Sequence, residues 1–181
     1  MNIFAVDYNP VVAARSLCDR HLSKMSVETA QMISAALIKH KCPVSKLPLT
    51  KAGTPYRGGH PHHPATLWSG ETQGNYRWLC LHGLALTSEF KKRYKKTHAC
   101  RKPIQDMCGL LSYIPKGELT PFARCINKET YPELHDKSQW RSVVLAYRAY
   151  YMLDKKGFAE WKGDRNPPLW WNPNFTLEVT Q

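Results

Sequence analysis

The residue types best suited to chemistry lie in one stretch near the start of the chain, residues 19–31. An α-helix turns by about 100° per residue, so side chains three, four or seven positions apart share one face. Four polar residues fall on one such stripe: His21, Lys24, Glu28 and Gln31. A carboxylate, an amine and an imidazole on one face are groups that general acid–base and covalent catalysis use.

Apolar residues border this stripe. Three of them fall within about 40° of His21 on the same helical wheel: Leu17, Met25 and Met32. Partial shelter from water favours the perturbed pKa values that are typical of functional carboxylates and imidazoles. The alternative is an ordinary ion pair of Lys24 with Glu28, although the lysine-first order is the weaker one for helix stability. The spacing alone leaves both interpretations open.

The same stretch resembles a known family. Its pattern is Asp19…Leu22-x-Lys24-x-x-Val27-Glu28-x-x-Gln31, and a later motif is His62-His63-Pro64-Ala65 followed by Trp68. Together they resemble the pyrimidine-dimer DNA glycosylase superfamily, which includes the phage endonuclease V type of UV-repair enzyme and its bacterial relatives. The resemblance implies a DNA-repair enzyme that binds duplex DNA and cleaves an N-glycosidic bond at damaged or modified pyrimidines. It implies no metal and no organic cofactor.

The resemblance also implies four catalytic residues: Glu28, Met1, Lys24 and His21. Enzymes of the endonuclease V type attack the sugar with their own α-amino group. That amine would belong to Met1, because methionine is usually kept before a side chain as large as that of Asn2. It adds to C1′, expels the base and leaves a Schiff base from which the strand can be eliminated. Glu28 would stabilise the developing cation, and Lys24 would be a substitute amine.

Three positions depart from the endonuclease V pattern: Asn2, Val27 and Gln31. That type of enzyme exposes a small second residue and carries arginines at the other two positions. Val27 and Gln31 instead fit the bacterial relatives. These departures keep a second hypothesis open, namely a DNA-binding or DNA-base-modifying protein on the same fold without glycosylase chemistry.

The charge balance indicates a polyanionic partner. Lys and Arg number 26 against 14 Asp and Glu, which gives a formal net charge of +12. This surplus favours nucleic acid over a membrane surface, since no long basic amphipathic helix is evident, and the resemblance implies double-stranded DNA. The six cysteines form no Cys-x-x-Cys pair, and neither a signal peptide nor a membrane-length apolar run is evident. A reduced, cytoplasmic protein is therefore expected.

Residues 41–63 form a long connection rich in proline and glycine, and its basic residues, such as Arg57, suit passage along a phosphate backbone. It ends in three closely spaced histidines: His60, His62 and His63. Read alone, they suggest a metal site, which gives a third, weaker hypothesis of a histidine-metal nuclease. By the resemblance, His63-Pro64 starts a helix that brings His62 or His63 near the catalytic stripe. A purely structural N-cap is the alternative.

Further basic residues are expected to contact phosphates. One predicted helix ends in a basic cluster of five residues: Lys91, Lys92, Arg93, Lys95 and Lys96. Such cations could simply compensate the helix dipole, but the overall charge favours a phosphate-contact patch. Arg20, Arg148 and Tyr151 complete the expected DNA contacts, the tyrosine by stacking on an extruded base. Burial of Tyr151 in the core is the alternative.

The expected fold is all-α, a single helical domain over residues 1–181 with long irregular basic loops. Hydrophobic periodicity predicts five helices: 10–40, 65–70, 75–96, 103–111 and 138–155. The first could be broken near Ser26, and Asn9-Pro10 suits its N-cap and first turn. The first seven residues are apolar enough to enter the core as extended chain. Residues 157–181 are expected to form an aromatic strap over the hydrophobic surface.

Overall fold

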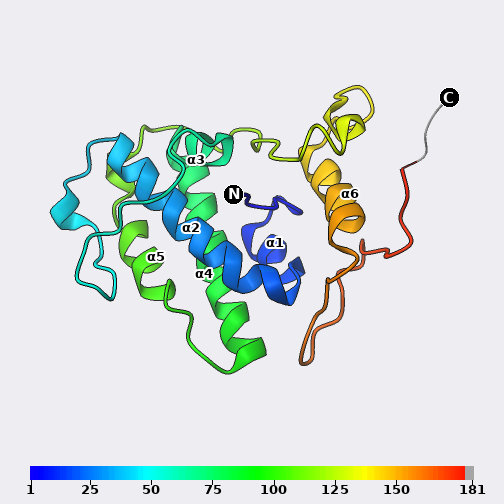
Figure 1. Ribbon diagram of the computed structural model, residues 1–181. Helices are drawn as coiled ribbons and strands as arrows, with labels where there is room; N and C mark the ends of the chain where they lie inside the picture. The colour runs from blue at the N-terminus through cyan, green and yellow to red at the C-terminus, as the bar shows by residue number, and fades with distance from the viewer. Residues whose placement is uncertain (178–181) are drawn as a thin grey trace.

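Six α-helices dominate residues 1–177, the part of the chain that this computed structural model describes (Figure 1). They are α1 (Pro10–Ser16), α2 (Asp19–Lys39), α3 (Pro64–Ser69), α4 (Gln73–Tyr94), α5 (Arg101–Cys108) and α6 (Val143–Lys155). Three short 3-10 helices accompany them: Val44–Lys46, Leu111–Tyr113 and Pro132–His135. Residues 1–177 contain no β-strand, so the prediction of an all-α fold is confirmed.

The first residues enter the core as extended chain, as the sequence predicts. Ile3 is 1% exposed, and Ala5 and Val6 are fully buried. The side chain of Asn9 then caps α1 by accepting hydrogen bonds from the amides of Val11 and Val12, with proline at the first helical position. This arrangement brings the start of the chain into the middle of the molecule, beside α2 (Figure 1).

The break in the first predicted helix lies at Leu17 and Cys18, not near Ser26. Both residues have extended backbone, with ψ of 144° and 165°, between the end of α1 and the start of α2. Ser26 lies inside α2, where its hydroxyl donates to the carbonyl of Leu22 at 2.7 Å. Its hydroxyl is therefore satisfied without interrupting the helix.

Helices α2 and α4 pack along each other at the centre of the fold. Gly83 permits the close approach, because a Cβ atom at this position would lie 2.6 Å from Cγ2 of Thr29. Helix α4 begins at Gln73 with Thr72 as its N-cap, slightly before the predicted start at residue 75. No helix within residues 1–177 combines the length and hydropathy needed to cross a membrane.

The last helix, α6, begins later than predicted. Ser138 is engaged in a turn, where its amide and hydroxyl both donate to Asp136, and Ser142 supplies the N-cap instead. Beyond α6, the chain runs back across the α1–α2 junction: the indole of Trp161 donates to the carbonyl of Ser16 at 3.1 Å. The predicted aromatic strap packs in this way over its described part, residues 157–177, and its last four residues lie outside the described range.

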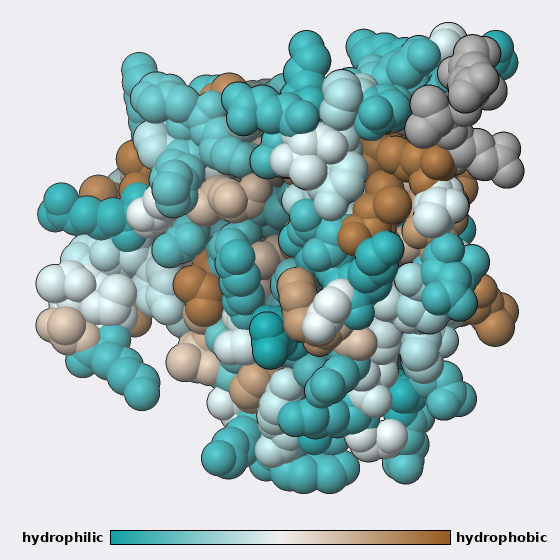
Figure 2. All heavy atoms as spheres, turned by 45° about the vertical axis from the view of Figure 1, so that its right-hand side comes forward, coloured by the Kyte–Doolittle hydropathy of each residue, from teal (hydrophilic) through white to brown (hydrophobic). Residues whose placement is uncertain are grey.

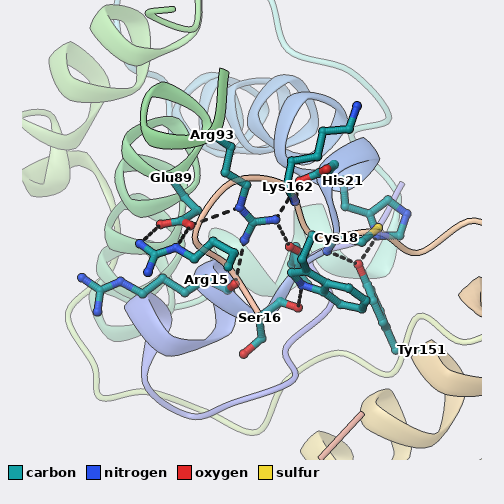
Figure 3. A network of polar contacts seen from close by, with 12 residues as sticks. Arg15, Ser16, Cys18, His21, Glu89, Arg93, Tyr151 and Lys162 are labelled. Atoms are coloured by element: carbon teal, nitrogen blue, oxygen red, sulfur yellow. Dashed lines mark hydrogen bonds and ion pairs between the residues drawn. The ribbon is translucent and has the colours of Figure 1, made fainter. Parts of the chain in front are cut away.

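A buried ion-pair network joins three distant parts of the chain (Figure 3). Arg93, near the end of α4, pairs with Glu89 at 3.1 Å and with Asp19, at the start of α2, at 3.0 Å. The side chains of all three residues are at most 6% exposed. Arg165 in the strap pairs with Glu89 through two nitrogens. Burial opposes ionisation of Glu89, but the hydrogen bonds and charges of Arg165 and Arg93 outweigh it and lower its pKa.

We expect the substitution Arg93→Met to lower the free energy of unfolding by about 3–5 kcal/mol, because it leaves buried carboxylates without their partner. Urea denaturation at neutral pH measures this change. Lys91→Met is the matched control, since Lys91 lies two residues before Arg93 on the same helix and is exposed, and it should stay within about 0.5 kcal/mol of wild type. Equal stabilities for the two variants would contradict this role for the network.

Candidate active site

An open cavity of about 490 Å³ lies where the start of the chain meets α2, α3 and α6. One wall carries residues that the sequence singles out: Met1, His21, Lys24, Glu28 and His63. The other wall comes from later parts of the chain and includes Arg124, Cys125, Ile126, Asn127, Tyr150 and Lys155. Three of the four stripe residues, His21, Lys24 and Glu28, therefore line this hollow.

Glu28 contacts the start of the chain directly. Its Oε2 accepts a hydrogen bond of 2.7 Å from the backbone amide of Asn2. The Nζ atom of Lys24 lies 3.8 Å from Oε1, but the lysine side chain is 68% exposed whereas that of Glu28 is only 13% exposed. The ion pair expected from the helical spacing therefore exists, yet the sheltered contact of Glu28 is the one with Asn2. The ion-pair alternative for the stripe is therefore present, and the catalytic interpretation stays a prediction.

The side chain of Asn2 anchors this contact. Its Oδ1 accepts from the amides of Ile3 and Phe4, and its Nδ2 donates to the carbonyl of Cys125 at 2.7 Å. The turn that results gives Phe4 a φ of 45°, a left-handed conformation that is uncommon outside glycine. A small residue in place of Asn2 would lose the amide contacts, which gives this departure from the endonuclease V pattern a structural reason.

Met1 lies at the mouth of the cavity, next to α3. The hydroxyl of Thr66 contacts the Met1 sulfur at 3.3 Å. His63 caps α3, with its Nδ1 accepting from the amide of Ala65 at 3.2 Å, and it also lines the cavity. Burial, followed by the positive charges of the Met1 amine and His60, lowers the pKa of His63 against the opposing influence of Glu28. His63 thus combines both predicted roles, as N-cap and as neighbour of the stripe.

His21 is held by a hydrogen-bond chain at the other end of the cavity (Figure 3). The amide of Cys18 donates to the hydroxyl oxygen of Tyr151 at 3.0 Å, and that hydroxyl lies 2.6 Å from Nδ1 of His21. The imidazole also stacks on Phe4, with ring centroids 4.6 Å apart. Burial, together with the charges of Lys155 and Lys24, lowers the pKa of His21 to about 3. His21 is therefore neutral near pH 7 and does not act as a cation there.

The wall contributed by α6 was missed by the sequence reasoning. The ammonium of Lys155 lies 5.2 Å from the ring centroid of Tyr150 and 5.4 Å from that of Phe4, and it pairs with Asp154. No local motif marks these residues, because they face the stripe only through the tertiary packing of α6. The periodicity of α6 indicates a buried face, but it does not indicate what that face meets.

Two of the predicted DNA contacts are wrong because their side chains are buried. Tyr151 is fully buried, so it cannot stack on an extruded base, and the core alternative is correct. Arg93 has a side chain only 1% exposed within the ion-pair network, so it cannot serve as a phosphate contact. Four members of the predicted basic cluster remain exposed: Lys91, Lys92, Lys95 and Lys96.

The other predicted DNA contacts lie outside the main cavity. Arg20 is exposed above the ring of Phe158, with its guanidinium carbon 5.0 Å from the centroid. Arg148 donates to the carbonyl of Val6 and pairs with Asp7, so it braces the start of the chain.

The loop contacts lie along the second half of α2. Arg57 and His62 border a separate groove of about 400 Å³ between α2 and the basic loop. The loop is held close at Gly58 (φ 73°), because a Cβ atom there would lie 2.6 Å from the amide nitrogen of Ala35. Gln31 packs against Gly59 in the same loop.

The histidine cluster does not assemble a ligand set. Within residues 1–177, no three His, Cys, Asp or Glu side chains gather as they would around a metal ion. His63 turns toward the Met1 side of the molecule, whereas His62 borders the groove beside α2. The hypothesis of a nuclease built on His60, His62 and His63 therefore lacks its structural basis in the described part of the chain.

The first residues of this helical protein meet a carboxylate at a cavity, and sequence comparison identifies its family. The model of the pyrimidine dimer DNA glycosylase family matches residues 1–102. This match covers more than half of the chain and includes every residue of the α2 stripe. The chain belongs to the pyrimidine dimer DNA glycosylase family. No curated protein and no solved structure matches it.

A second buried histidine lies outside the cavity. His82 is completely buried and stacks on Trp78, with centroids 4.9 Å apart. Neither of its ring nitrogens has a hydrogen-bond partner within the described part of the chain. Burial lowers the pKa of His82 to about 3. Like His21, it must stay neutral for the chain to remain folded.

We expect the stability of the protein to fall as the pH drops from about 7 to about 5. Unfolding lets His21 and His82 regain their ordinary pKa of 6.5 from folded values of about 3. The unfolded state then binds more protons, so each histidine costs about 2 kcal/mol of stability at pH 5. Urea denaturation at both pH values measures the loss. In His82→Phe the loss between the two pH values should be smaller by about 2 kcal/mol, and an unchanged loss would contradict this assignment.

Proposed function

We propose that this protein is a DNA N-glycosylase that acts on damaged or modified pyrimidines in duplex DNA. The observation that carries the proposal is the 2.7 Å hydrogen bond between the Asn2 amide and the Glu28 carboxylate, which brings the start of the chain to the stripe of α2. An amine and a carboxylate at one cavity are the two groups that imine-forming glycosylase chemistry requires.

The Met1 amine is the proposed nucleophile. Its nitrogen lone pair forms a bond to C1′ of the target nucleotide, the N-glycosidic bond breaks, and the base leaves with that electron pair and takes up a proton. The sugar ring then opens, with a proton passing to O4′, to give an imine between the Met1 nitrogen and C1′. The Glu28 carboxylate stabilises the positive charge that develops at the sugar and relays these protons.

Strand cleavage can follow from the same imine. Loss of a proton from C2′ and departure of the 3′ phosphate break the strand by β-elimination, and water then releases the enzyme by hydrolysing the imine. Glu28 is the group placed to accept the C2′ proton. Lys24 is a substitute amine 3.8 Å from Glu28, but α-amino groups are more often neutral near pH 7 than lysine side chains are.

The basic surface suits the DNA substrate that the family implies. Exposed lysines lie at the end of α4, and this end is tied to the start of α2 by the ion pair of Arg93 with Asp19. They therefore lie at the same end of α2 as His21, within reach of a duplex whose target nucleotide enters the cavity. Figure 2 shows a mostly hydrophilic surface on the side of α6 and the strap, interrupted by smaller hydrophobic patches.

A second candidate function keeps DNA binding and drops the glycosylase step. It is favoured by one observation: the group bonded to Glu28 is the peptide nitrogen of Asn2, one residue beyond the Met1 amine. If Met1 were removed, the Asn2 nitrogen would itself become the amine beside Glu28. The two candidates therefore differ in whether a free amine can reach Glu28. A glycosylase requires such an amine, and a DNA-binding protein on the same fold does not.

We expect borohydride to trap a covalent adduct between the protein and a duplex that contains a thymine dimer or an abasic site. Reduction fixes the imine as a stable amine, and denaturing electrophoresis detects the adduct. Glu28→Gln should lower the rate of trapping at least about a hundredfold, because removing one electrostatic group from a catalytic site costs about this much. Acetylation of the N-terminal amine should abolish it.

Lys24→Met is the matched control for the identity of the amine, since it removes the other nearby nitrogen while leaving Glu28 in place. Its adduct should form within about threefold of the wild-type rate. Intact-protein mass spectrometry shows whether the amine belongs to Met1 or Asn2. Tight duplex binding without an adduct in any of these proteins would refute the glycosylase and support the second candidate.

A further inference from the structure

The cavity has two chemically different ends. Met1, Glu28 and His63 occupy the end at which the sugar would be attacked. His21 and Lys155 occupy the other end. Since His21 and Glu28 are seven residues apart on α2, they are separated by about 10 Å along the helix axis. A group that His21 contacts therefore belongs to the neighbouring part of the DNA strand and not to the attacked sugar.

One ring nitrogen of His21 is held by Tyr151. The hydroxyl oxygen of Tyr151 accepts from the Cys18 amide and lies 2.6 Å from Nδ1 of His21. When this hydroxyl donates its proton to Nδ1, the ring proton of the neutral imidazole is on Nε2, and the inference below uses this tautomer. Within residues 1–177 Nε2 has no protein partner, and His21 lines the cavity.

Burial and the neighbouring charges keep His21 neutral. Burial is the largest cause of its lowered pKa, Lys155 on α6 and Lys24 on its own helix lower the pKa further, and Asp154 opposes them. The remaining neighbours are aromatic: Phe4 stacks on the ring and Phe158 meets it edge-on, with centroids 5.7 Å apart. His21 therefore remains a donor of one hydrogen bond throughout the range in which the folded protein is stable.

Lys155 supplies the positive charge at the same end. Its side chain is only 14% exposed, and its ammonium is held by Asp154 and by the faces of Tyr150 and Phe4. Holding the ammonium in this way reduces the entropy lost when it binds a ligand. A fixed cation beside a neutral donor matches a group that has one negative charge and several acceptor oxygens.

We infer that His21 and Lys155 form a subsite for the phosphodiester that flanks the attacked nucleotide, with Tyr151 as the positioning residue that fixes the imidazole. This inference rests on the proposed function, because it takes the nucleotide next to Glu28 as the one attacked. It adds a specificity element from α6, outside the residues that the family match covers. The subsite holds the strand in register with the amine, so that C1′ lies at the nucleophile.

Equilibrium binding to duplexes with a reduced, uncleavable abasic site tests the subsite without requiring catalysis. In two further duplexes, the phosphodiester on either the 5′ or the 3′ side of that site is replaced by an uncharged methylphosphonate. Wild-type protein should lose about tenfold or more in affinity for one of these duplexes, the usual contribution of a hydrogen bond to a charged group. Equal affinity for all three duplexes would overturn the inference.

Variants of His21 and Lys155 test whether these two residues cause the loss of affinity for the methylphosphonate duplex. His21→Phe keeps the stacking on Phe4 but removes the donor, and Lys155→Met keeps the stem but removes the charge. Each should bind the all-phosphate duplex about tenfold more weakly and show little further loss on the sensitive methylphosphonate duplex. His21→Gln, which retains an amide donor, should recover part of the affinity. The matched control is Lys156→Met, an exposed neighbour of Lys155, which should keep the wild-type sensitivity to methylphosphonate.

Two other results would also overturn the inference. The first is additivity: the loss of binding free energy caused by a variant and the loss caused by the neutral linkage simply sum. These residues would then contact something other than the phosphodiester, for example the carbonyl oxygens of a neighbouring pyrimidine. Nitrogen-15 NMR that finds the His21 proton on Nδ1 would remove the donor. Failure of the proposed function has a different signature: borohydride then traps no adduct on the unmodified duplex, whether or not binding depends on the flanking phosphate.

Discussion

The hydrogen bond from the Asn2 amide to the Glu28 carboxylate is the contact on which the site depends. It joins residues 26 positions apart and fixes the start of the chain against α2, the helix that carries the polar stripe. The carboxamide of Asn2 strengthens the arrangement by binding two following amides and the carbonyl of Cys125. Because these groups are largely buried, the start of the chain is a structural element and not a loose end.

The ion-pair network of Arg93 supports this contact from a distance. It joins the end of α4, the start of α2 and the strap, and so it fixes the end of α2 that carries His21, the first residue of the stripe. The strap and α6 in turn hold Lys155 and Tyr151 against that stripe. Buried ion pairs add little net stability when compared with apolar packing, but they strongly disfavour arrangements in which one partner is missing. The network thus specifies one geometry of the cavity.

Much of the fold and half of the site could be predicted from the sequence. The 3.6-residue periodicity predicted a helix over residues 10–40 and the common face of His21 and Glu28, but it did not predict the break at Leu17 and Cys18. The Asn9-Pro10 pair marked one helix start, because capping is a local interaction, and the family resemblance marked the start at His63-Pro64. The wall of α6 could not be predicted, since its contact with the stripe depends on how distant helices pack. The same reason explains Arg93 and Tyr151: their residue types suit DNA, but burial, which local sequence does not reveal, gives them partners inside the protein.

The two walls of the cavity come from parts of the chain that the ribosome makes at different times. One wall lies within residues 1–64, and the other lies within residues 124–155. While the chain is being synthesised, the first residues and Glu28 can approach each other before the aromatic and cationic groups opposite them exist. A ribosome-bound chain therefore carries only half of the hollow until residues 124–155 have been made and have packed against α2.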